Sequence, residues 1–303
     1  MPHLTSTTGG TTGASGTLGG ATGVTGTLGG ASGTLRGASG ASGTLRGASG
    51  ATGTPRGTSG ATGSAVGTAV RTALGVPGFA HPLVAPAQWA ALARPGTPLD
   101  WVALDVAGGP GARPDPHCLA AADPLHHAGV RVLGRLDLAR GVRARADLLR
   151  DAHRYLDWYR VDGFLLDRCP LDRGELDGVR RVLGDLRAIT DTAHLVLGHG
   201  THPHPGYAEH ADQLVTFSGS WSDYRWSQVA EWTADHPPER FCHFVHGVPR
   251  GHLEEALRVA RWQGAATIYF TDRTAGRGSG DPWEAMPGYW DEIVSRLGTG
   301  VSE

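Results

Sequence analysis

The chain has 303 residues and a formal net charge of −2 at pH 7, with 27 basic against 29 acidic side chains. This near-neutral balance lacks the basic excess typical of nucleic-acid-binding proteins, so no nucleic-acid partner is expected. No run approaches the roughly 20 apolar residues of a membrane span, and no basic start precedes an apolar segment at the N-terminus, so we expect no membrane partner and a cytoplasmic location.

The cysteines agree with that location. Cys118, Cys169 and Cys242 are odd in number and widely spaced, without a C-x-x-C pair. Such a set is typical of free or buried thiols in a reducing compartment rather than of a disulfide framework.

Residues 1–72 differ in composition from the rest of the chain. They are rich in Gly, Thr, Ser and Ala, with a ten-residue near repeat in GTLRGASGAS, GTLRGASGAT and GTPRGTSGAT, which begin at Gly33, Gly43 and Gly53. Glycine loses much backbone entropy on ordering, and this segment has little apolar area to offset the loss. We therefore expect a disordered low-complexity tail that serves as a solvated linker, followed by one folded domain over residues 73–303.

Short apolar runs alternate with helical patterns in the folded domain. Continuous apolar runs are typical of strands that are buried on both faces of a parallel sheet. The predicted strands cover residues 74–80, 100–107, 130–138, 163–167, 194–200, 213–219, 241–248 and 266–272. The predicted helices cover residues 85–94, 117–129, 145–159, 175–190, 227–234, 252–264 and 289–298, and Pro124 is expected to interrupt the second of them.

Eight strands, each followed by a helix or loop, predict an α/β fold of the (β/α)8 TIM-barrel type. The alternative is a doubly wound open sheet, which normally carries a G-x-G-x-x-G phosphate loop after its first strand. No such loop occurs there, and GGPGARP after the second strand lacks the spacing. The barrel is therefore favoured.

Catalytic and binding residues of such a barrel lie at the C-terminal ends of its strands. The polar residues at these ends are His81, Asp105, Asp137, Asp167 with Arg168, His199, Ser218, His246 and Asp272. Aromatic residues lie nearby in the loops, namely Trp221, Tyr224, Trp226, Trp283 and Tyr289. Rings that pack on C–H faces, beside polar groups that bind hydroxyls, are how many proteins hold sugars, so a carbohydrate is the expected ligand.

Several blocks of sequence follow one another in a distinctive order: PGFAHP, LDVAGGPG, GVRVLGRLDLARGVR, WYRVDGFLLDR, GHGTHP…YAEHADQLVTFSGSWSDY and IYFTDR…DPWEAMPGYWDEIV. In these blocks the chain from Leu74 to Leu297 resembles the spherulin-4 family (spherulation-specific family 4). The resemblance implies a barrel of the galactosaminidase type, which hydrolyses galactosamine-rich polysaccharide at internal bonds. It also implies that relatives are often secreted.

The chain departs from the family pattern at the expected catalytic positions. The family's Asp-Glu pair after the fourth strand is here Asp167-Arg168, and the Glu of the sixth strand is replaced by Ser218. The family's Asn-Pro after the second strand becomes Asp105-Val106, and Asn-Pro-Gly-Thr after the fifth becomes the sequence from Gly198 to Thr201. Of the three carboxylates that the resemblance implies, only Asp167 remains.

Glycoside hydrolysis normally needs two carboxyl groups roughly 5 to 9.5 Å apart. Asp167 and Asp105 are the candidate catalytic residues, with Asp137 as an alternative partner and assistance by a substrate N-acetyl group as another route. Arg168 would keep Asp167 ionised and make it a poor proton donor, unless the arginine points to the opposite face of the strand. The candidate substrate-binding residues are His81, Asp137, Arg168, His199, Ser218, Trp221, Tyr224, His246 and Asp272.

Several candidates have simpler interpretations. Asp137 and Asp272 can cap loops or pair with Arg140, Arg143 or Arg273 instead of binding substrate. The histidines at 199, 202, 204, 243 and 246 show no H-E-x-x-H spacing, so neither a metal nor another cofactor is predicted. Ser218 lacks the G-x-S-x-G turn of a serine nucleophile.

We therefore expect a glycoside-hydrolase-like barrel that acts on or binds amino-sugar polysaccharide. The alternative is a carbohydrate-binding or regulatory protein whose catalytic activity has lapsed, and a metal-dependent hydrolase of another substrate is a third candidate. The sequence does not decide the oligomeric state.

Overall fold

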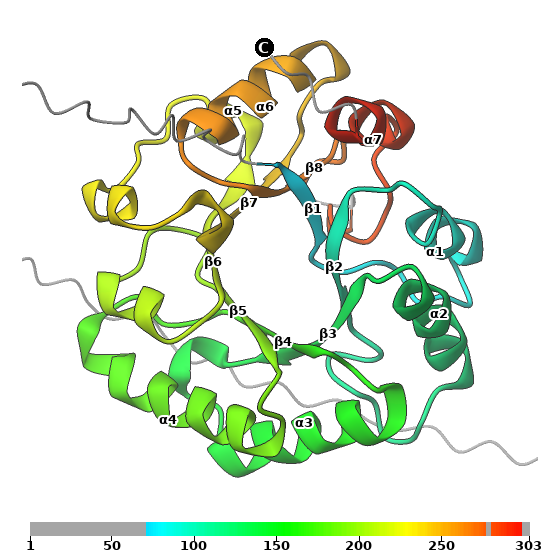
Figure 1. The fold of residues 1–303 in the computed structure, drawn as a ribbon, viewed down its shortest axis with the longest axis vertical. Helices are drawn as coiled ribbons and strands as arrows, with labels where there is room; N and C mark the ends of the chain where they lie inside the picture. Colours follow the sequence, from blue (N-terminus) through cyan, green and yellow to red (C-terminus); the bar gives the residue numbers. More distant parts are fainter. Residues whose placement is uncertain (1–70, 277–279, 299–303) are drawn as a thin grey trace, which may run out of the picture. The chain divides into compact units, whose positions relative to one another are not determined.

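The computed structural model describes residues 71–276 and 280–298. The predicted disordered tail lies outside the described residues, except for Arg71 and Thr72, which directly precede the first strand. From there the strands form a closed parallel barrel in chain order, β1 to β8, and β8 pairs with β1 (Figure 1). The predicted (β/α)8 barrel is confirmed.

The strands lie where the apolar runs predict them. β4 has the predicted bounds, and the other strands differ from the predicted ones by a few residues at their ends. The strands are β1 (Ala73–Val76), β2 (Leu99–Leu104), β3 (Arg131–Asp137), β4 (Gly163–Asp167), β5 (His194–Gly198), β6 (Gln213–Ser220), β7 (Phe241–His246) and β8 (Thr267–Phe270).

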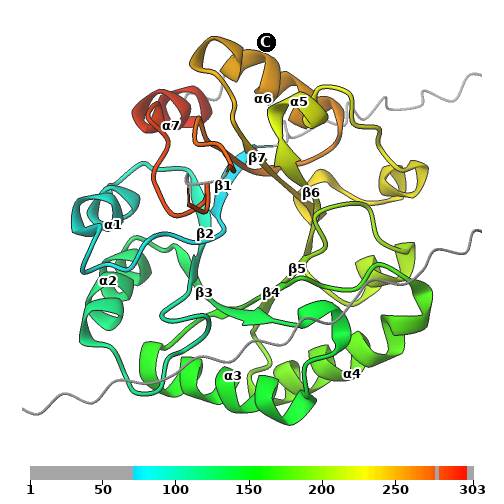
Figure 2. The ribbon, with the colours of Figure 1, turned by 180° about the vertical axis from the view of Figure 1, so that it is seen from behind.

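The helices cover the outside of the barrel, and Figure 2 shows the same arrangement from the opposite end. They are α1 (Pro86–Leu92), α2 (Pro116–His127), α3 (Arg145–Tyr159), α4 (Arg173–Ile189), the single turn α5 (Trp221–Tyr224), α6 (Leu253–Trp262) and α7 (Trp290–Gly298). Short 3-10 helices occupy Ala139–Gly141, Pro205–Glu209, Glu231–Asp235, Pro238–Arg240 and Arg250–His252. None of the helices among the described residues is long and apolar enough to cross a membrane.

Two helix predictions were wrong. Pro124 does not interrupt α2, which continues to His127, because proline removes one donor while its own carbonyl still accepts the N–H of Ala128 at 3.1 Å. Residues 227–234 do not form an α-helix. There the hydroxyls of Ser227 and Thr233 each donate to a carbonyl three residues back, at 2.8 Å, and such bonds compete with helix formation.

Alternation along the strands decides which side chains enter the barrel. Leu133, Arg135 and Asp137 share one face of β3, while Gly134 lies on the face toward α3. A Cβ at Gly134 would lie 2.6 Å from the ring of Tyr155, so the glycine allows α3 to pack closely on the strand. Arg135 therefore enters the barrel interior, although it is a charged residue in an otherwise apolar run.

Candidate functional site

The C-terminal ends of the strands surround a cavity of about 450 Å³. All eight strands or the loops that follow them contribute to it, β8 through the loop before α7. Of the predicted site residues, the cavity is lined by His81, Asp105, Asp167, Arg168, His199 and Ser218. The cavity thus lies at the end of the barrel where such folds carry their chemistry.

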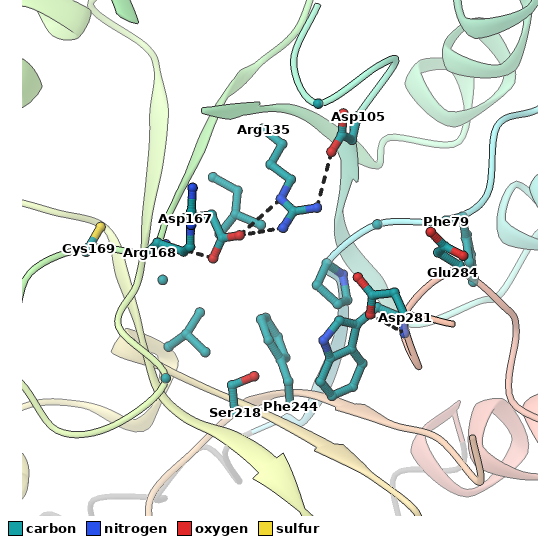
Figure 3. A pocket seen from close by; sticks show the side chains of 18 of the residues that line it. Phe79, Asp105, Arg135, Asp167, Arg168, Cys169, Ser218, Phe244, Asp281 and Glu284 are labelled. Carbon is teal, nitrogen blue, oxygen red and sulfur yellow. Dashed lines mark hydrogen bonds and ion pairs between the residues drawn. The ribbon is translucent and has the colours of Figure 1, made fainter. Parts of the chain in front are cut away.

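Arg135 is the centre of the charged wall of this cavity. Its Nε and Nη2 donate to Asp167 Oδ2 at 3.2 and 2.5 Å, and its Nη1 donates to Asp105 Oδ2 at 3.2 Å. Figure 3 shows the guanidinium between the two carboxylates. The register explains this placement, because Arg135 pairs with Leu165, two residues before Asp167 on the same face of β4.

The other oxygens of the two carboxylates also have donors. Asp167 Oδ1 accepts the backbone N–H of Arg168 at 2.8 Å, and Asp105 Oδ1 accepts the N–H of Gly109 at 2.9 Å. Burial lowers the pKa of Arg135, but the charges of Asp167 and Asp105 outweigh that effect, and the pKa lies above the ordinary arginine value. The arginine therefore stays a cation, and both carboxylates act as acceptors.

Arg168 turns its guanidinium away from Asp167. Its backbone has a φ of 49°, in the left-handed region, and its Nε donates to Asp137 Oδ1 at 2.8 Å, with Nη2 on the other oxygen. Asp137 Oδ1 also accepts the N–H of Ala139 at 2.7 Å. The hydrogen bond from Arg168 lowers the pKa of Asp137, and burial opposes the shift. Asp137 thus caps a loop and forms an ion pair with Arg168, outside the set that lines the cavity.

An aromatic wall faces the charged one. Phe79, Phe244 and Trp283 line the cavity, and the ring centroids of Phe244 and Trp283 lie 6.1 Å apart in an edge-to-face contact. Figure 3 places Phe244 and Ser218 across the cavity from Asp167. The loop that carries Trp283 also supplies two lining carboxylates, Asp281 and Glu284.

His199 is held at the cavity wall by one of its two nitrogens. Since a carbonyl can only accept, its Nδ1 donates to the carbonyl of Pro170 at 2.9 Å, and among the described residues its Nε2 has no hydrogen-bond partner. Burial lowers the pKa of His199 to about 4. The ring is therefore neutral at pH 7, and its Nε2 is a buried acceptor.

The remaining predicted residues do not line the cavity. Tyr224 is fully buried and its hydroxyl contacts His243 Nδ1 at 2.8 Å, while Trp221 is 6% exposed and packs on Tyr224. His246 packs beside Trp283, with ring centroids 5.8 Å apart. Asp272 Oδ1 accepts the N–H of Gly288 at 2.9 Å. Asp272 thus makes the loop contact that the sequence offered as the alternative to substrate binding.

Several lining residues were missed at the sequence level. Arg135 had a detectable signal, because a charged residue within an apolar strand needs a partner inside the barrel. Asp281 and Glu284 lie in a block that carries the family resemblance, but their loop has no periodicity that would single them out as lining residues. The three cysteines are free and buried, as predicted. Burial and the carboxylates of Asp115 and Asp105 raise the pKa of Cys118 to about 12.

Comparison with known proteins agrees with this architecture. The model of spherulation-specific family 4 matches residues 74–297. The solved structure of Sph3 from Aspergillus clavatus in complex with GalNAc is 22% identical, with a TM-score of 0.65 over 76% of this chain and 99% of that one. No curated protein sequence matches the chain.

Two further solved structures are more distant. The glycoside hydrolase domain of PelA from Pseudomonas aeruginosa is 18% identical, with a TM-score of 0.42 over 66% of this chain and 95% of that one. Active domain 2 of a thermostable chitinase from Pyrococcus furiosus is 13% identical, with a TM-score of 0.45 over 75% of this chain and 96% of that one.

Proposed function

The chain belongs to spherulation-specific family 4, and from that premise we propose that its cavity binds an amino-sugar saccharide without cleaving it. The binding half of this proposal is supported by the two unlike walls. Phe79, Phe244 and Trp283 offer ring faces for sugar C–H groups, and the charged groups opposite offer partners for hydroxyl and amide groups. The similar Aspergillus protein holds GalNAc, which favours an amino sugar.

The engagement of both candidate carboxylates by Arg135 carries the second half of the proposal. Glycoside hydrolysis needs one carboxyl group that can donate a proton to the leaving oxygen and a second that acts as nucleophile or base. Here all four oxygens of Asp105 and Asp167 accept hydrogen bonds from N–H groups, and one guanidinium joins the two residues. This engagement of both carboxylates supports the proposed loss of cleavage.

The test compares binding with cleavage on the same saccharides. Wild type should bind galactosamine-containing oligosaccharides in isothermal titration calorimetry and release no reducing ends from amino-sugar or neutral polysaccharides. Trp283→Ala should weaken binding roughly tenfold, because it removes one ring of the wall. Trp262→Ala is the matched control, since this residue of α6 is 75% exposed and does not line the cavity.

If wild type releases reducing ends and Asp167→Asn does not, the proposal that the protein does not cleave its ligand is overturned. Absence of binding to every saccharide, in a folded protein, would overturn the carbohydrate ligand itself. The two outcomes are distinct because the first leaves binding intact.

A second candidate function is a rewired hydrolase. Glu284 lines the cavity, and among the described residues its carboxylate takes part in no hydrogen bond or ion pair. It is thus the lining carboxylate with the fewest protein partners among the described residues. A hydrolase of this kind would lose reducing-end release in both Asp167→Asn and Glu284→Gln, whereas the binding protein that we propose shows no release to lose.

A further inference from the structure

A cluster of three metal-ligating side chains borders the cavity on the side of α2. His81 follows β1, Asp115 directly precedes α2, and Cys118 lies in the first turn of that helix. His81 Nε2 lies 3.3 Å from Cys118 Sγ and 3.4 Å from Asp115 Oδ2, and the three atoms lie within 4.8 Å of one another. Among residues 71–276 and 280–298, no other set of three such side chains converges in this way.

The convergence distinguishes this cluster from a catalytic triad. In a triad the histidine uses one nitrogen for the nucleophile and the other for the carboxylate. Here Nε2 faces both the thiol and the carboxylate, while Nδ1 accepts the backbone N–H of Leu83 at 3.3 Å. Three ligand atoms directed at one point are the arrangement of a metal site rather than of a proton relay.

The spacing of these atoms suits a tetrahedral ion. Zinc bonds of roughly 2.3 Å to sulfur and roughly 2.0–2.2 Å to nitrogen and oxygen place neighbouring ligand atoms roughly 3.4–3.6 Å apart. The observed separations from His81 Nε2 are 3.3 Å and 3.4 Å. Two of the three separations are thus already close to those of a tetrahedral site, and the third, between Cys118 Sγ and Asp115 Oδ2, is within 4.8 Å.

The helix start orients the carboxylate for this role. Asp115 Oδ1 caps α2 by accepting the N–H groups of His117 and Cys118 at 2.8 and 3.2 Å. Its backbone N–H donates to the hydroxyl of Tyr159 at 3.0 Å. With one oxygen held as a cap, the other is left for the ion, and such outer contacts commonly fix the ligands of metal sites.

Charge and softness point to the kind of ion. On binding, the ion displaces the proton of Cys118 to solvent. The thiolate and the carboxylate then neutralise a divalent cation, so the site is neutral in a place where Cys118 is fully buried and the other two side chains are only about one quarter exposed. A thiolate with an imidazole favours zinc over the oxygen-seeking magnesium and calcium. His81 Nε2 can bind the ion only when the ring proton is on Nδ1. The exposed N–H of Leu83 then donates to water instead of to Nδ1.

We propose that His81, Asp115 and Cys118 bind one zinc-type divalent cation at the rim of the cavity, with water in the fourth position. This proposal goes beyond the sugar-binding function, because Asp115 and Cys118 do not line the cavity, and only His81 belongs to both sites. It also departs from the sequence-level expectation of no metal, which considered the histidines after the fifth and seventh strands.

The test uses the full chain without an affinity tag, first stripped with a chelator. Zinc titration should give one tight site per chain in calorimetry, and cobalt should give a sulfur-to-cobalt charge-transfer band in the near ultraviolet. Cys118→Ser should abolish that band, and His81→Gln and Asp115→Asn should each weaken zinc binding roughly tenfold or more. Asn is chosen at position 115 because it still caps a helix.

Cys242→Ser is the matched control, because this buried thiol contacts Gln213 and takes no part in the cluster. It should bind zinc as wild type does. Absence of a one-to-one site would overturn the proposal, and so would a cobalt band that persists in Cys118→Ser. Circular dichroism on each variant separates a lost ligand from a lost fold.

Discussion

The polar networks at the two ends of the barrel interior differ in burial and in charge. At the N-terminal end the amide of Gln213 accepts the indole N–H of Trp101 at 2.7 Å and donates to Thr267 and Asp100 at 3.1 Å, and Trp101 is fully buried. At the C-terminal end, Arg135 and its two carboxylates keep 22–32% of their side-chain surface exposed. The first network is buried and neutral except for Asp100, which is 20% exposed and pairs with Arg131, whereas every member of the second is charged and partly exposed.

This difference indicates which end serves stability and which serves binding. A satisfied, buried network fixes one packing arrangement and is costly to break. A partly exposed ion pair contributes little net stability, because desolvation offsets much of its attraction. The charged cluster is therefore better explained by the binding function that we propose for the cavity than by the stability of the barrel.

The largest expected effect is at the N-terminal end. Trp101→Ala should lower the free energy of unfolding by about 3–5 kcal/mol, because it opens a cavity and removes a donor from buried Gln213. Urea unfolding measures the change. Trp262→Ala, at a residue that is 75% exposed, should stay within about 0.5 kcal/mol of wild type. Equal losses in the two variants would contradict the comparison.

Two histidines extend the comparison to acid pH. His243 is buried, with Tyr224 and Thr216 on its two nitrogens, whereas only one nitrogen of His199 is bonded. Burial lowers the pKa of His199 to about 4 and that of His243 to about 3. The unfolded chain binds these protons near the ordinary histidine pKa, so stability falls as the pH drops from about 6.5 to about 4.

His199→Gln tests this at the cavity wall, since glutamine can still donate to the carbonyl of Pro170. Between about pH 7 and about pH 4.5, the variant should lose about 1–3 kcal/mol less unfolding free energy than wild type. Urea unfolding across that pH range measures the difference. Parallel pH profiles would show that His199 does not carry this acid sensitivity.

The fold was predictable because each strand carries its own signal. The run from Gly163 to Asp167 is continuously apolar and ends on a carboxylate, and its bounds agree with β4. The failed helix at 227–234 shows the limit, because side-chain bonds to the backbone there outweigh a helical pattern. Local pattern therefore predicts which elements form wherever nothing else competes for their hydrogen bonds.

The site was predictable in position but not in its connections. Asp105 and Asp167 line the cavity because strand ends do so in any such barrel. That both bind Arg135 depends on the register between β3 and β4, which no single strand encodes. The direction of the Arg168 side chain depends on a left-handed backbone at a residue that rarely adopts it.

The smallest expected effect is at the mouth itself, where Arg135→Met removes the shared cation but keeps a side chain of similar length. The carboxylates of Asp105 and Asp167 then repel each other, and the free energy of unfolding should fall by only about 1 kcal/mol, because water reaches the cluster. That loss should shrink in about 1 M salt, where charges are screened within roughly 3 Å.

Arg145→Met is the matched control, because this arginine pairs with Asp185 on the outer surface and should change stability by less than about 0.5 kcal/mol. A loss in Arg135→Met as large as that in Trp101→Ala, and insensitive to salt, would mean that the charged cluster holds the barrel together, and the division between the two ends would fail.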